Sequence, residues 1–409
     1  QLSIILGAKF GSLLSLGIGP IVTASIVLQL LNGSGILKID MTTEDGKKTF
    51  QGLQKVLALF FIIFEAIIYV FMGGLAPSAA LTGSVFRSVQ FLLVFQLFLG
   101  GLLILFMDEV VAKWGFGSGI SLFIAAGVSE QIFITALSPL NSAGRLAWGS
   151  GLPAIGKVWI FFTSLFNGDI VSMGLAFAAI ASTIFVFLLA VYAQAMKVEI
   201  PLSFGRVRGY GIRWPLRFIY TSNIPVILVA ALMANMQLWA RLLERWGYPL
   251  LGTFSGNTPV TGIVSWLFSP NVVRNLLTGT LQGIDLAHAG VYILFMMGGA
   301  VIFSIFWVQT SGMDARSQAK QIMSSGLQIP GFRRDQRVLE RILGRYIFPL
   351  TIMGALTVGF LAASADLLGA LSRGTGILLA VMIIYKLYED VSKQHMMDMH
   401  PMLRKMMGK

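Results

Sequence analysis

Few side chains in this sequence are suited to covalent chemistry. The chain has no cysteine, which excludes disulfides and cysteine-based metal or nucleophile sites. Its three histidines are His288, His395 and His400, and the last two lie in a charged C-terminal tail. Ser118 has the glycine neighbours of a nucleophilic serine, but the one histidine near an apolar stretch, His288, lies at the outer end of another stretch. We therefore expect no enzymatic activity, no metal site and no cofactor.

One ionisable side chain lies inside an otherwise apolar stretch. Glu65 follows Phe60-Phe61-Ile62-Ile63-Phe64 directly. An ionisable group within a membrane helix costs about 2.5–3.5 kcal/mol on insertion scales, so such a residue is treated as functional by default. The alternative is a neutral carboxyl group hydrogen-bonded to a neighbouring helix. Thr23 and Asn235 are the other polar residues within apolar stretches that could partner it.

The first apolar stretch contains the helix-breaking segment Gly17-Ile18-Gly19-Pro20. Proline removes a backbone donor and disfavours helical geometry at the residue before it. Backbone groups freed within a membrane are tolerated only where protein or water meets them. The segment is therefore either a packed kink or the end of a half-helix that faces a cavity, as in pores and transporters.

The elements that position these residues are membrane helices. Of the 409 residues 56% are hydrophobic and only 12% are charged, about half the share of a soluble domain. A helix needs about 20 apolar residues to cross the hydrocarbon core. Nine stretches approach or meet that length, and we predict that each is a transmembrane helix: Leu13–Leu31, Leu53–Met72, Val89–Met107, Gly117–Ala136, Met173–Ala195, Ile224–Trp239, Ala289–Val308, Tyr346–Ala363 and Gly374–Tyr388.

Basic residues are distributed unequally between the two sides that these helices define. Most of the 30 lysines and arginines fall on the side of the C-terminal tail, which the positive-inside rule makes cytoplasmic. Two loops on that side, Val198–Ser222 and Gln309–Arg345, are especially rich in arginine. Such loops either only determine topology or form docking sites for polyanions such as nucleic acid.

On the other side, two long segments are rich in glycine and poor in charge, Ser138–Ser172 and Arg241–His288. Within the first, Leu152–Phe166 is apolar but too short to span, so we expect an interfacial or re-entrant piece. Asp366 falls in the short turn before the last predicted helix, and we interpret it as a turn or cap residue. Residues 1–10 have no basic region or cleavage site of a signal peptide, and we expect that part of the true N-terminus is missing.

Six blocks of sequence carry a resemblance to the SecY family, whose members form the pore subunit of the protein translocon. In chain order, the blocks that resemble this family are Gly17–Ile26, Gly117–Gly127, Val198–Leu202, Thr221–Leu228, Pro330–Arg333 and Gly374–Leu379. They occur in family order over essentially the whole chain, and their details are similar to the archaeal type. The agreement of six blocks is much more specific than any one of them.

The resemblance implies an all-α membrane protein, a bundle of two pseudo-symmetric halves with nine of the family's ten helices visible and the first one missing. Residues 1–14 would be the remnant of a plug segment. The N-terminal half would be residues 15–137, the external loop 138–172 and the C-terminal half 173–391, with cytoplasmic loops 196–222 and 309–345. Residues 392–409 would be a cytoplasmic tail.

The resemblance also assigns roles to particular residues. Aliphatic side chains on four helices would form a ring that closes the pore: Ile18, Val22, Ile120, Ile124, Ile227 and Leu379. By sequence alone each of these would be ordinary helix packing. Thr23, Glu65 and Asn235 match the polar cluster of the family's lateral gate. Arg206, Arg208, Arg333 and Arg334 match loop tips that dock onto the ribosome, although Phe204-Gly205 stands where the family usually has a histidine.

The implied function is passive conduction of unfolded polypeptides across the cell membrane, with lateral release of transmembrane segments into lipid. The sequence contains no GxxxxGK[ST] motif for ATP, so the driving force must come from a partner. The implied partners are a SecE-type (gamma) subunit, a small beta subunit, the translating ribosome with its RNA and protein, and signal sequences and nascent chains. The alternatives are an ion-coupled secondary transporter that uses Glu65 and, with less support, a membrane scaffold.

Overall fold

The computed structural model describes residues 16–39, 44–71, 75, 77, 83–115, 119–141, 143–147, 152–204, 211–221, 224–245, 247–255, 258–324, 327–328 and 335–399. The chain forms two compact units, residues 1–156 together with 383–409, and residues 157–382. The boundary at residue 156 falls within the segment that the sequence indicated as an external loop. Each unit is described by itself below.

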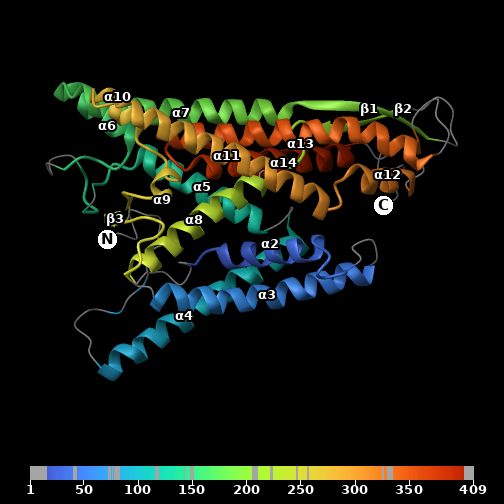
Figure 1. Cartoon of the computed structure of the whole chain (residues 1–409), viewed down its shortest axis with the longest axis horizontal. Coiled ribbons are helices and arrows are strands. Elements are labelled where there is room, and N and C mark those ends of the chain that lie inside the picture. The colour runs from blue at the N-terminus through green and yellow to red at the C-terminus, as the bar shows by residue number, and fades with distance from the viewer. Residues whose placement is uncertain are drawn as a thin grey trace. The chain divides into compact units, whose positions relative to one another are not determined.

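The first unit contains four helices at predicted positions. They are α2 (Gly19–Gly33), α3 (Glu44–Phe71), α4 (Gly83–Trp114) and α5 (Gly119–Leu137). Helix α3 packs against both α2 and α4, and Figure 1 shows it running beside them. The predicted plug segment, residues 1–14, lies outside the described residues. The first predicted span, Leu13–Leu31, is described only from Leu16 onward.

Helix α3 buries one face and exposes the other. Ala58, Ile62, Ala66 and Val70 recur every four residues and are buried, whereas Phe60, Phe64 and Phe71 are exposed. A four-residue spacing places side chains on one side of a helix. Helix α4 meets that side through a glycine, because a Cβ atom at Gly101 would lie only 2.5 Å from Cγ2 of Ile62. Small residues at such a crossing are typical of helices that pack within membranes.

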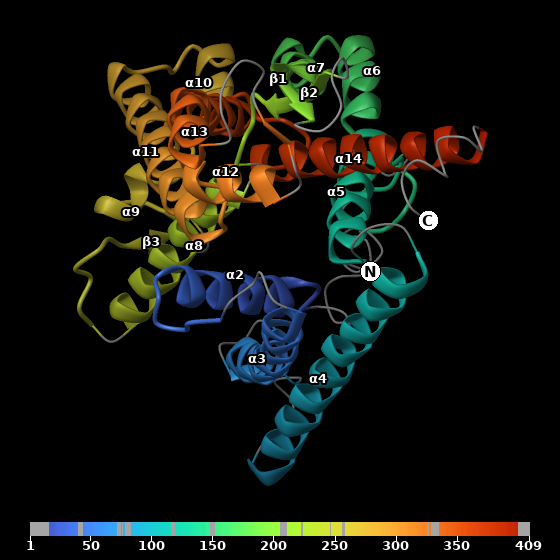
Figure 2. The ribbon, with the colours of Figure 1, turned by 90° about the vertical axis from the view of Figure 1, so that its right-hand side faces the viewer.

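The second unit contains the remaining long helices. They are α7 (Ile170–Ala195), α8 (Ile224–Arg245), α11 (Gly283–Thr310), α13 (Gln336–Leu367) and the first part of α14 (Gly374–Met399). Shorter helices are α6 (Lys157–Asn167), α9 (Ile263–Trp266), α10 (Val272–Leu277) and α12 (Ala315–Ser324). Figure 2 shows α11 and α13 side by side, with α12 at one end of α13.

The contact between α11 and α13 leaves no room for an additional side-chain atom. A Cβ atom at Gly359 of α13 would lie 3.0 Å from Cα of Met297 and 3.1 Å from the Met296 carbonyl oxygen, both on α11. Likewise, a Cβ atom at Gly354, a second glycine of α13, would lie 2.7 Å from the carbonyl oxygen of Phe218. Because the neighbouring atoms are backbone, they cannot give way as a flexible side chain would.

Each of the nine predicted spans contains a helix in the described part of the chain, the first only from Gly19 onward. Among the described residues, five helices are long and apolar enough to cross a membrane: α3, α4, α7, α11 with α12, and α13. Helices α8 and α14, which correspond to two other predicted spans, are not among these five. Helices α2 and α5 are apolar but shorter. The predicted interfacial piece, Leu152–Phe166, corresponds largely to α6, which packs against α7 and exposes Phe162 and Phe166.

The sequence analysis did not foresee the short strands. The loop after α7 forms the hairpin β1 (Lys197–Phe204) and β2 (Gly211–Arg217), and β5 (Leu327–Gln328) pairs with β1 to give the order β2-β1-β5. A second, two-stranded sheet joins β3 (Phe254–Ser255) to β4 (Thr258–Pro259). Alternation of apolar and charged residues in Lys197-Val198-Glu199-Ile200 is the period of a half-buried strand. The arginine-rich composition of the loop Val198–Ser222 drew the interpretation toward docking or topology, and the short strand pattern was missed.

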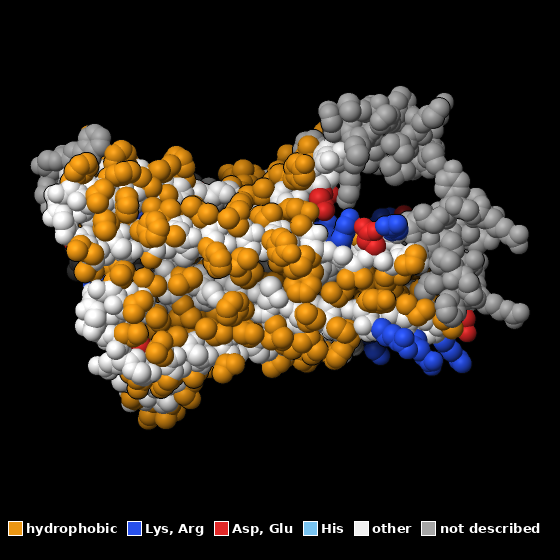
Figure 3. Space-filling view, turned by 90° about the horizontal axis from the view of Figure 1, so that it is seen from above, with side chains coloured by type: hydrophobic (Ala, Val, Ile, Leu, Met, Phe, Trp, Pro, Cys, Tyr) orange, Lys and Arg blue, Asp and Glu red, His pale blue; other side chains and the backbone are white. Residues whose placement is uncertain are grey.

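The hairpin has its own core against the ends of the long helices. Ile200 and Leu216 pack with residues of α11, α12 and α13, including Ala319, Leu339 and Leu343. On the other face of the hairpin, the carboxylate of Glu199 accepts from Lys197 and Arg213 at 3.2 Å each. These hydrogen bonds, the one from Lys197 having the larger effect and the one from Arg213 the smaller, lower the pKa of Glu199 below its usual range. In Figure 3, lysine and arginine side chains gather at the end where these strands lie.

Replacement of Gly359 by valine should destabilise the second unit. The added atoms must push the α11 backbone away, which in a packed core costs about 1–3 kcal/mol. Gly290→Val is the matched control, because a Cβ atom at Gly290 of α11 meets nothing within 4 Å. Thermal unfolding in detergent measures the difference. Equal unfolding midpoints for the two variants would mean that the α11–α13 contact adapts without cost.

Candidate functional site

The six predicted ring residues fall on helices of both units. Ile18 lies in the turn before α2, Val22 in α2, Ile120 and Ile124 in α5, Ile227 in α8 and Leu379 in α14. Each described side chain among them is half-buried, and the side chain of Ile120 lies outside the described residues. The structure leaves the closure of a ring between the units untested, so the ring stays a prediction.

Within the first unit, the helix geometry pairs the predicted ring residues. Ile18 and Val22 are four residues apart, as are Ile120 and Ile124, and this spacing puts both members of a pair on one face of a helix. The adjacent face of α2 carries Ile21 and Ala24, which are buried against α3. Ile18 packs against this same buried cluster, so it also contributes to the contact between α2 and α3.

The break near Pro20 is a helix start. Helix α2 begins at Gly19, with the proline in its first turn, and Gly17 has a φ of +58°. A proline in the first turn costs no helical hydrogen bond, because the amides of that turn have no partner within the helix. The described residues thus show a helix start at Gly19, and the choice between a packed kink and a half-helix end depends on residues before Leu16, which lie outside the described part of the chain.

Glu65 points toward this helix start. Its carboxyl oxygen Oε2 would lie 3.5 Å from a Cβ atom at Gly19, and the Thr23 side chain lies beside the same carboxyl group. The Thr23 hydroxyl donates to the carbonyl oxygen of Gly19 at 2.9 Å. The predicted pair of Thr23 and Glu65 is therefore brought together within one unit. Asn235, the third member, lies in α8 of the other unit, and its side chain is outside the described residues.

The four predicted docking arginines also lie outside the described residues, but the strands that carry their loops are described. Arg206 and Arg208 fall in residues 205–210, between β1 and β2, and Arg333 and Arg334 fall in residues 329–334, after β5. Strand β5 pairs with the end of β1, with Phe204 opposite Leu327 and Ser203 opposite Gln328. Two loops separated by more than a hundred residues therefore start from neighbouring strands of one sheet.

This sheet is anchored to the helices by a half-buried tyrosine. Tyr220 follows β2, and its hydroxyl donates to the carbonyl oxygen of Met313, between α11 and α12, at 2.7 Å. Burial of the ring, together with the negative charge of Asp314, raises the pKa of Tyr220 to about 12. The hydroxyl therefore remains a donor throughout the physiological range of pH.

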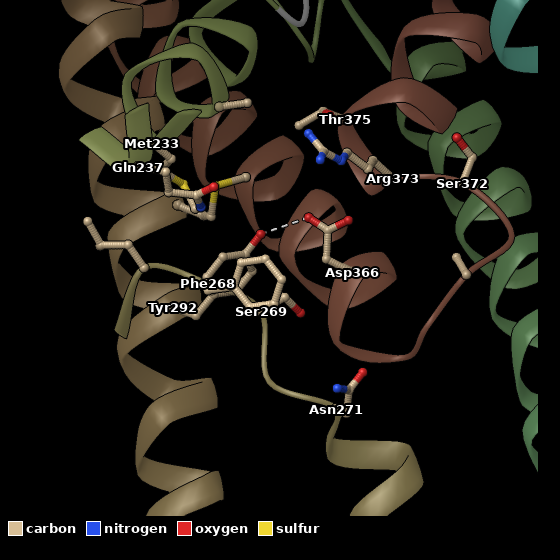
Figure 4. Close-up of a pocket in the computed structure, with 14 residues that line it drawn as sticks. Met233, Gln237, Phe268, Ser269, Asn271, Tyr292, Asp366, Ser372, Arg373 and Thr375 are labelled. Atoms are coloured by element: carbon tan, nitrogen blue, oxygen red, sulfur yellow. Dashed lines mark hydrogen bonds between the residues drawn. The ribbon is translucent and has the colours of Figure 1, made fainter. Parts of the chain in front are cut away.

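Sequence analysis missed a polar cluster in the second unit. It lines a cavity of about 330 Å³ between α8, α11 and the corner that joins α13 to α14. Figure 4 shows Asp366 and Tyr292 hydrogen-bonded at this cavity, with Arg373 and Thr375 beside them. We interpreted Asp366 as a turn or cap residue. It lies in the last turn of α13 rather than in the turn after it. It does cap the next helix, because its Oδ1 accepts the amide of Gly374, the first residue of α14.

No group of three or more histidine, aspartate or glutamate side chains among the described residues is arranged to hold a metal ion. What the described structure presents instead is a set of aliphatic helix faces, one polar pair at a helix start and a sheet at the base of two arginine-rich loops.

Comparison with known proteins identifies the family. The SecY family model matches residues 12–388. The chain is 45% identical to the protein translocase subunit SecY of Methanothermobacter thermautotrophicus, over all of this chain and 86% of that protein. It is 42% identical to the SecY subunit of Methanocaldococcus jannaschii, over 99% of this chain and 86% of that protein.

Solved structures agree with that assignment. One described as the structure of a protein conducting channel is 42% identical, with a TM-score of 0.75, over 96% of this chain and 85% of that one. Canine Sec61, from a ribosome–channel complex of the endoplasmic reticulum, is 41% identical, with a TM-score of 0.73, over 98% of this chain and 85% of that one. Both the matched residues and the helical fold therefore extend over nearly the whole chain, which belongs to the SecY family.

Proposed function

We propose that this chain is the pore subunit of a protein-conducting channel, which passes unfolded polypeptides across the membrane and releases transmembrane segments sideways into lipid. The observation that carries the proposal is the match to SecY proteins over nearly the whole chain, at 45% identity for one archaeal member. The apolar helices supply the spanning wall. No comparison supports an ion-coupled transporter, and the carboxyl group of Glu65 has Thr23 rather than a charged group as its described partner.

The two units would be the two halves of the family's hourglass, and six aliphatic side chains would close its waist. Those residues are Ile18, Val22, Ile120 and Ile124 of the first unit, with Ile227 and Leu379 of the second. A wall that must let any side chain pass should offer it no specific hydrogen bonds, and a narrow apolar constriction blocks ions by dewetting. The half-burial of the described members supports this role, since each has a surface that its own unit does not cover.

Residues 1–14 would be the remnant of a plug that seals the resting pore. A SecY structure that is 43% identical to this chain, with a TM-score of 0.75, is described as showing that the plug domain stabilises the closed state and maintains a membrane seal. The start of α2 at Gly19 supports the proposal, because the described residues just before it, Leu16–Ile18, form a turn rather than helix.

The lateral gate would use the polar groups near the start of α2. Thr23 and Glu65 meet in the first unit, and Asn235 of the second would complete the cluster across the seam. A hydrogen bond between membrane helices contributes about 0.6–2 kcal/mol. A seam held by one or two such bonds would stay closed at rest and still open for a signal sequence.

The partners would act at the cytoplasmic side and around the two halves. The translating ribosome would dock on the loops that carry Arg206, Arg208, Arg333 and Arg334, and it would supply the driving force. The canine relative comes from a ribosome–channel complex. The common sheet beneath the two loops supports a joint docking surface. A SecE-type (gamma) subunit and a small beta subunit are implied by the family resemblance.

The protein would be a multi-pass protein of the cell membrane, with its C-terminus in the cytoplasm. The basic loops lie on the side of the C-terminal tail, and the positive-inside rule assigns that side to the cytoplasm.

The ring makes a prediction about ion leak. Replacing Ile120 and Ile227 together by serine should raise ion conductance of vesicles that contain the channel, because hydroxyl groups favour water in the constriction. Ile63→Ser with Ile302→Ser is the matched control, since both isoleucines are exposed on the outer faces of long helices. Wild-type conductance in the first variant, or equal leak in both, would contradict the ring.

The gate makes a prediction that separates stability from function. In Glu65→Leu the Thr23 hydroxyl keeps its bond to the Gly19 carbonyl, so no buried donor is left unpaired and the free energy of unfolding should change by less than about 1 kcal/mol. Loss of the proposed bond between Glu65 and Asn235 should nevertheless lower the hydrophobicity that a test segment needs to enter lipid.

The measurement is the fraction of a graded series of segments that is inserted rather than translocated. Asn235→Leu should also raise the inserted fraction for segments of intermediate hydrophobicity. The double variant should raise it no further than either single variant, as expected of partners in one bond. A large loss of stability with an unchanged series would make Glu65 a structural residue.

The docking surface makes a prediction about salt. Arg333→Glu with Arg334→Glu should weaken ribosome binding and flatten the decline of log affinity with log salt, because fewer counterions are released. Lys47→Glu with Lys48→Glu reverses two exposed charges at the start of α3 and serves as the control. If both pairs weaken binding equally, the arginines act only through net charge. A fall in membrane yield would mean that they act in assembly.

A further inference from the structure

The corner between α13 and α14, residues Leu368–Arg373, is hydrogen-bonded to a distant helix. The backbone amide of Leu371 donates to Oγ1 of Thr183 in α7 at 2.9 Å, and this bond is buried. The Thr183 hydroxyl in turn donates to the Ala179 carbonyl oxygen at 2.7 Å. Thr183 lies 13 residues after Ile170, the first residue of α7, which is about 20 Å along that helix. The corner is therefore recessed along α7 rather than level with its end.

A second set of bonds joins the start of α14 to α11 through Asp366. Oδ1 of Asp366 accepts the amide of Gly374, the first residue of α14, at 2.8 Å. Oδ2 accepts the hydroxyl of Tyr292 in α11, also at 2.8 Å. Figure 4 shows the two side chains directed at each other across the cavity, with Arg373 close to the carboxylate. One side chain thus connects three helices.

The start of α14 cannot shift freely, because Gly374 is packed against the end of α13. A Cβ atom at Gly374 would lie 2.1 Å from the carbonyl oxygen of Ala362 and 2.8 Å from Cβ of Ala365. The next turn is anchored by Ile377 and Leu378, which are 1% and 2% exposed. Leu379 follows directly and is five residues, or about 7.5 Å, beyond Gly374. A rotation or slide at the corner therefore moves Leu379 by a similar amount.

The lining of the cavity beside this carboxylate is partly apolar, with Met233 and Phe268, and partly polar. The polar side chains are Gln237, Ser269, Asn271, Ser372, Arg373 and Thr375. These polar groups can hold water, which competes for the bonds of Asp366. The link between α11 and α14 is therefore of the kind that a conformational change can break and remake, unlike the buried bond of Thr183.

We propose that Asp366 is a positioning residue for the pore. By holding the first amide of α14 to the Tyr292 hydroxyl of α11, it sets the depth and rotation at which α14 presents Leu379. This inference rests on the proposed function for the assignment of Leu379 to the pore. It adds a residue, outside the ring, that controls how well the ring closes.

The functional test is ion leak in reconstituted vesicles. Tyr292→Phe removes one bond of the carboxylate and Asp366→Ala removes both, so leak should rise in the order wild type, Tyr292→Phe, Asp366→Ala. The double variant should leak no more than Asp366→Ala alone, because both substitutions break the same link. Asn271→Ala, in the same cavity, should leave the leak unchanged.

Leu379→Ser distinguishes failure of this inference from failure of the ring. If Leu379→Ser raises the leak and Tyr292→Phe does not, Asp366 does not position the pore although the ring stands. If Leu379→Ser has no effect, Leu379 is not in the ring, and a direct measurement of helix position then decides whether the link exists.

The absence of cysteine allows that measurement. A spin label at Thr375→Cys, in the first turn of α14, would be the only label on the chain. Tyr292→Phe should increase the mobility of this label, and Asp366→Ala should increase it further. Unchanged mobility in Tyr292→Phe, with the protein folded, would overturn the proposal, because α14 would then be positioned without the link.

Discussion

Backbone amides and carbonyls within the apolar thickness of a membrane must find partners inside the protein, and this constraint governs where the helices of this chain can begin. Each unsatisfied group in hydrocarbon costs several kcal/mol. Long helices satisfy their own groups everywhere except in the first and last turns. Three helices begin at glycines within the six blocks, α2 at Gly19, α5 at Gly119 and α14 at Gly374, and the starts of α2 and α14 depend on special arrangements.

These two starts meet the constraint in different ways. Helix α2 begins at Gly19-Pro20, and the proline has no amide to satisfy. Helix α14 begins at Gly374, whose amide is satisfied by a carboxylate from the preceding helix. In both cases a glycine lies against a neighbouring element, Glu65 for Gly19 and the Ala362 carbonyl for Gly374. Three of the six proposed pore residues, Ile18, Val22 and Leu379, lie within about one and a half turns of these two starts, so the packing at each helix start also determines where these side chains lie.

The second unit separates rigid contacts from contacts that can change. Backbone-to-backbone packing at Gly354 and Gly359 joins α13 to its neighbours without adjustable atoms. A buried hydroxyl pair, Thr221 and Ser304 at 2.8 Å, adds a bond that water does not reach. The Asp366–Tyr292 bond, in contrast, borders a polar cavity. A channel that must open and reseal needs both kinds of contact, a fixed frame and a few bonds that can be exchanged with water.

The sequence by itself determined the membrane class, the positions of the long helices and the family, because apolar runs of spanning length and six ordered blocks are local signals. It also indicated that Thr23 could partner Glu65, since few other polar groups lie within the spans. It did not reveal the hairpin of β1 and β2, whose alternating pattern was hidden by the charge of its loop. Nor did it reveal that β5 joins the two arginine-rich loops, or that Asp366 bonds Tyr292, 74 residues earlier. Those contacts were decided only by tertiary structure, because a hydrogen bond between residues far apart in the chain leaves no spacing pattern from which it could be predicted.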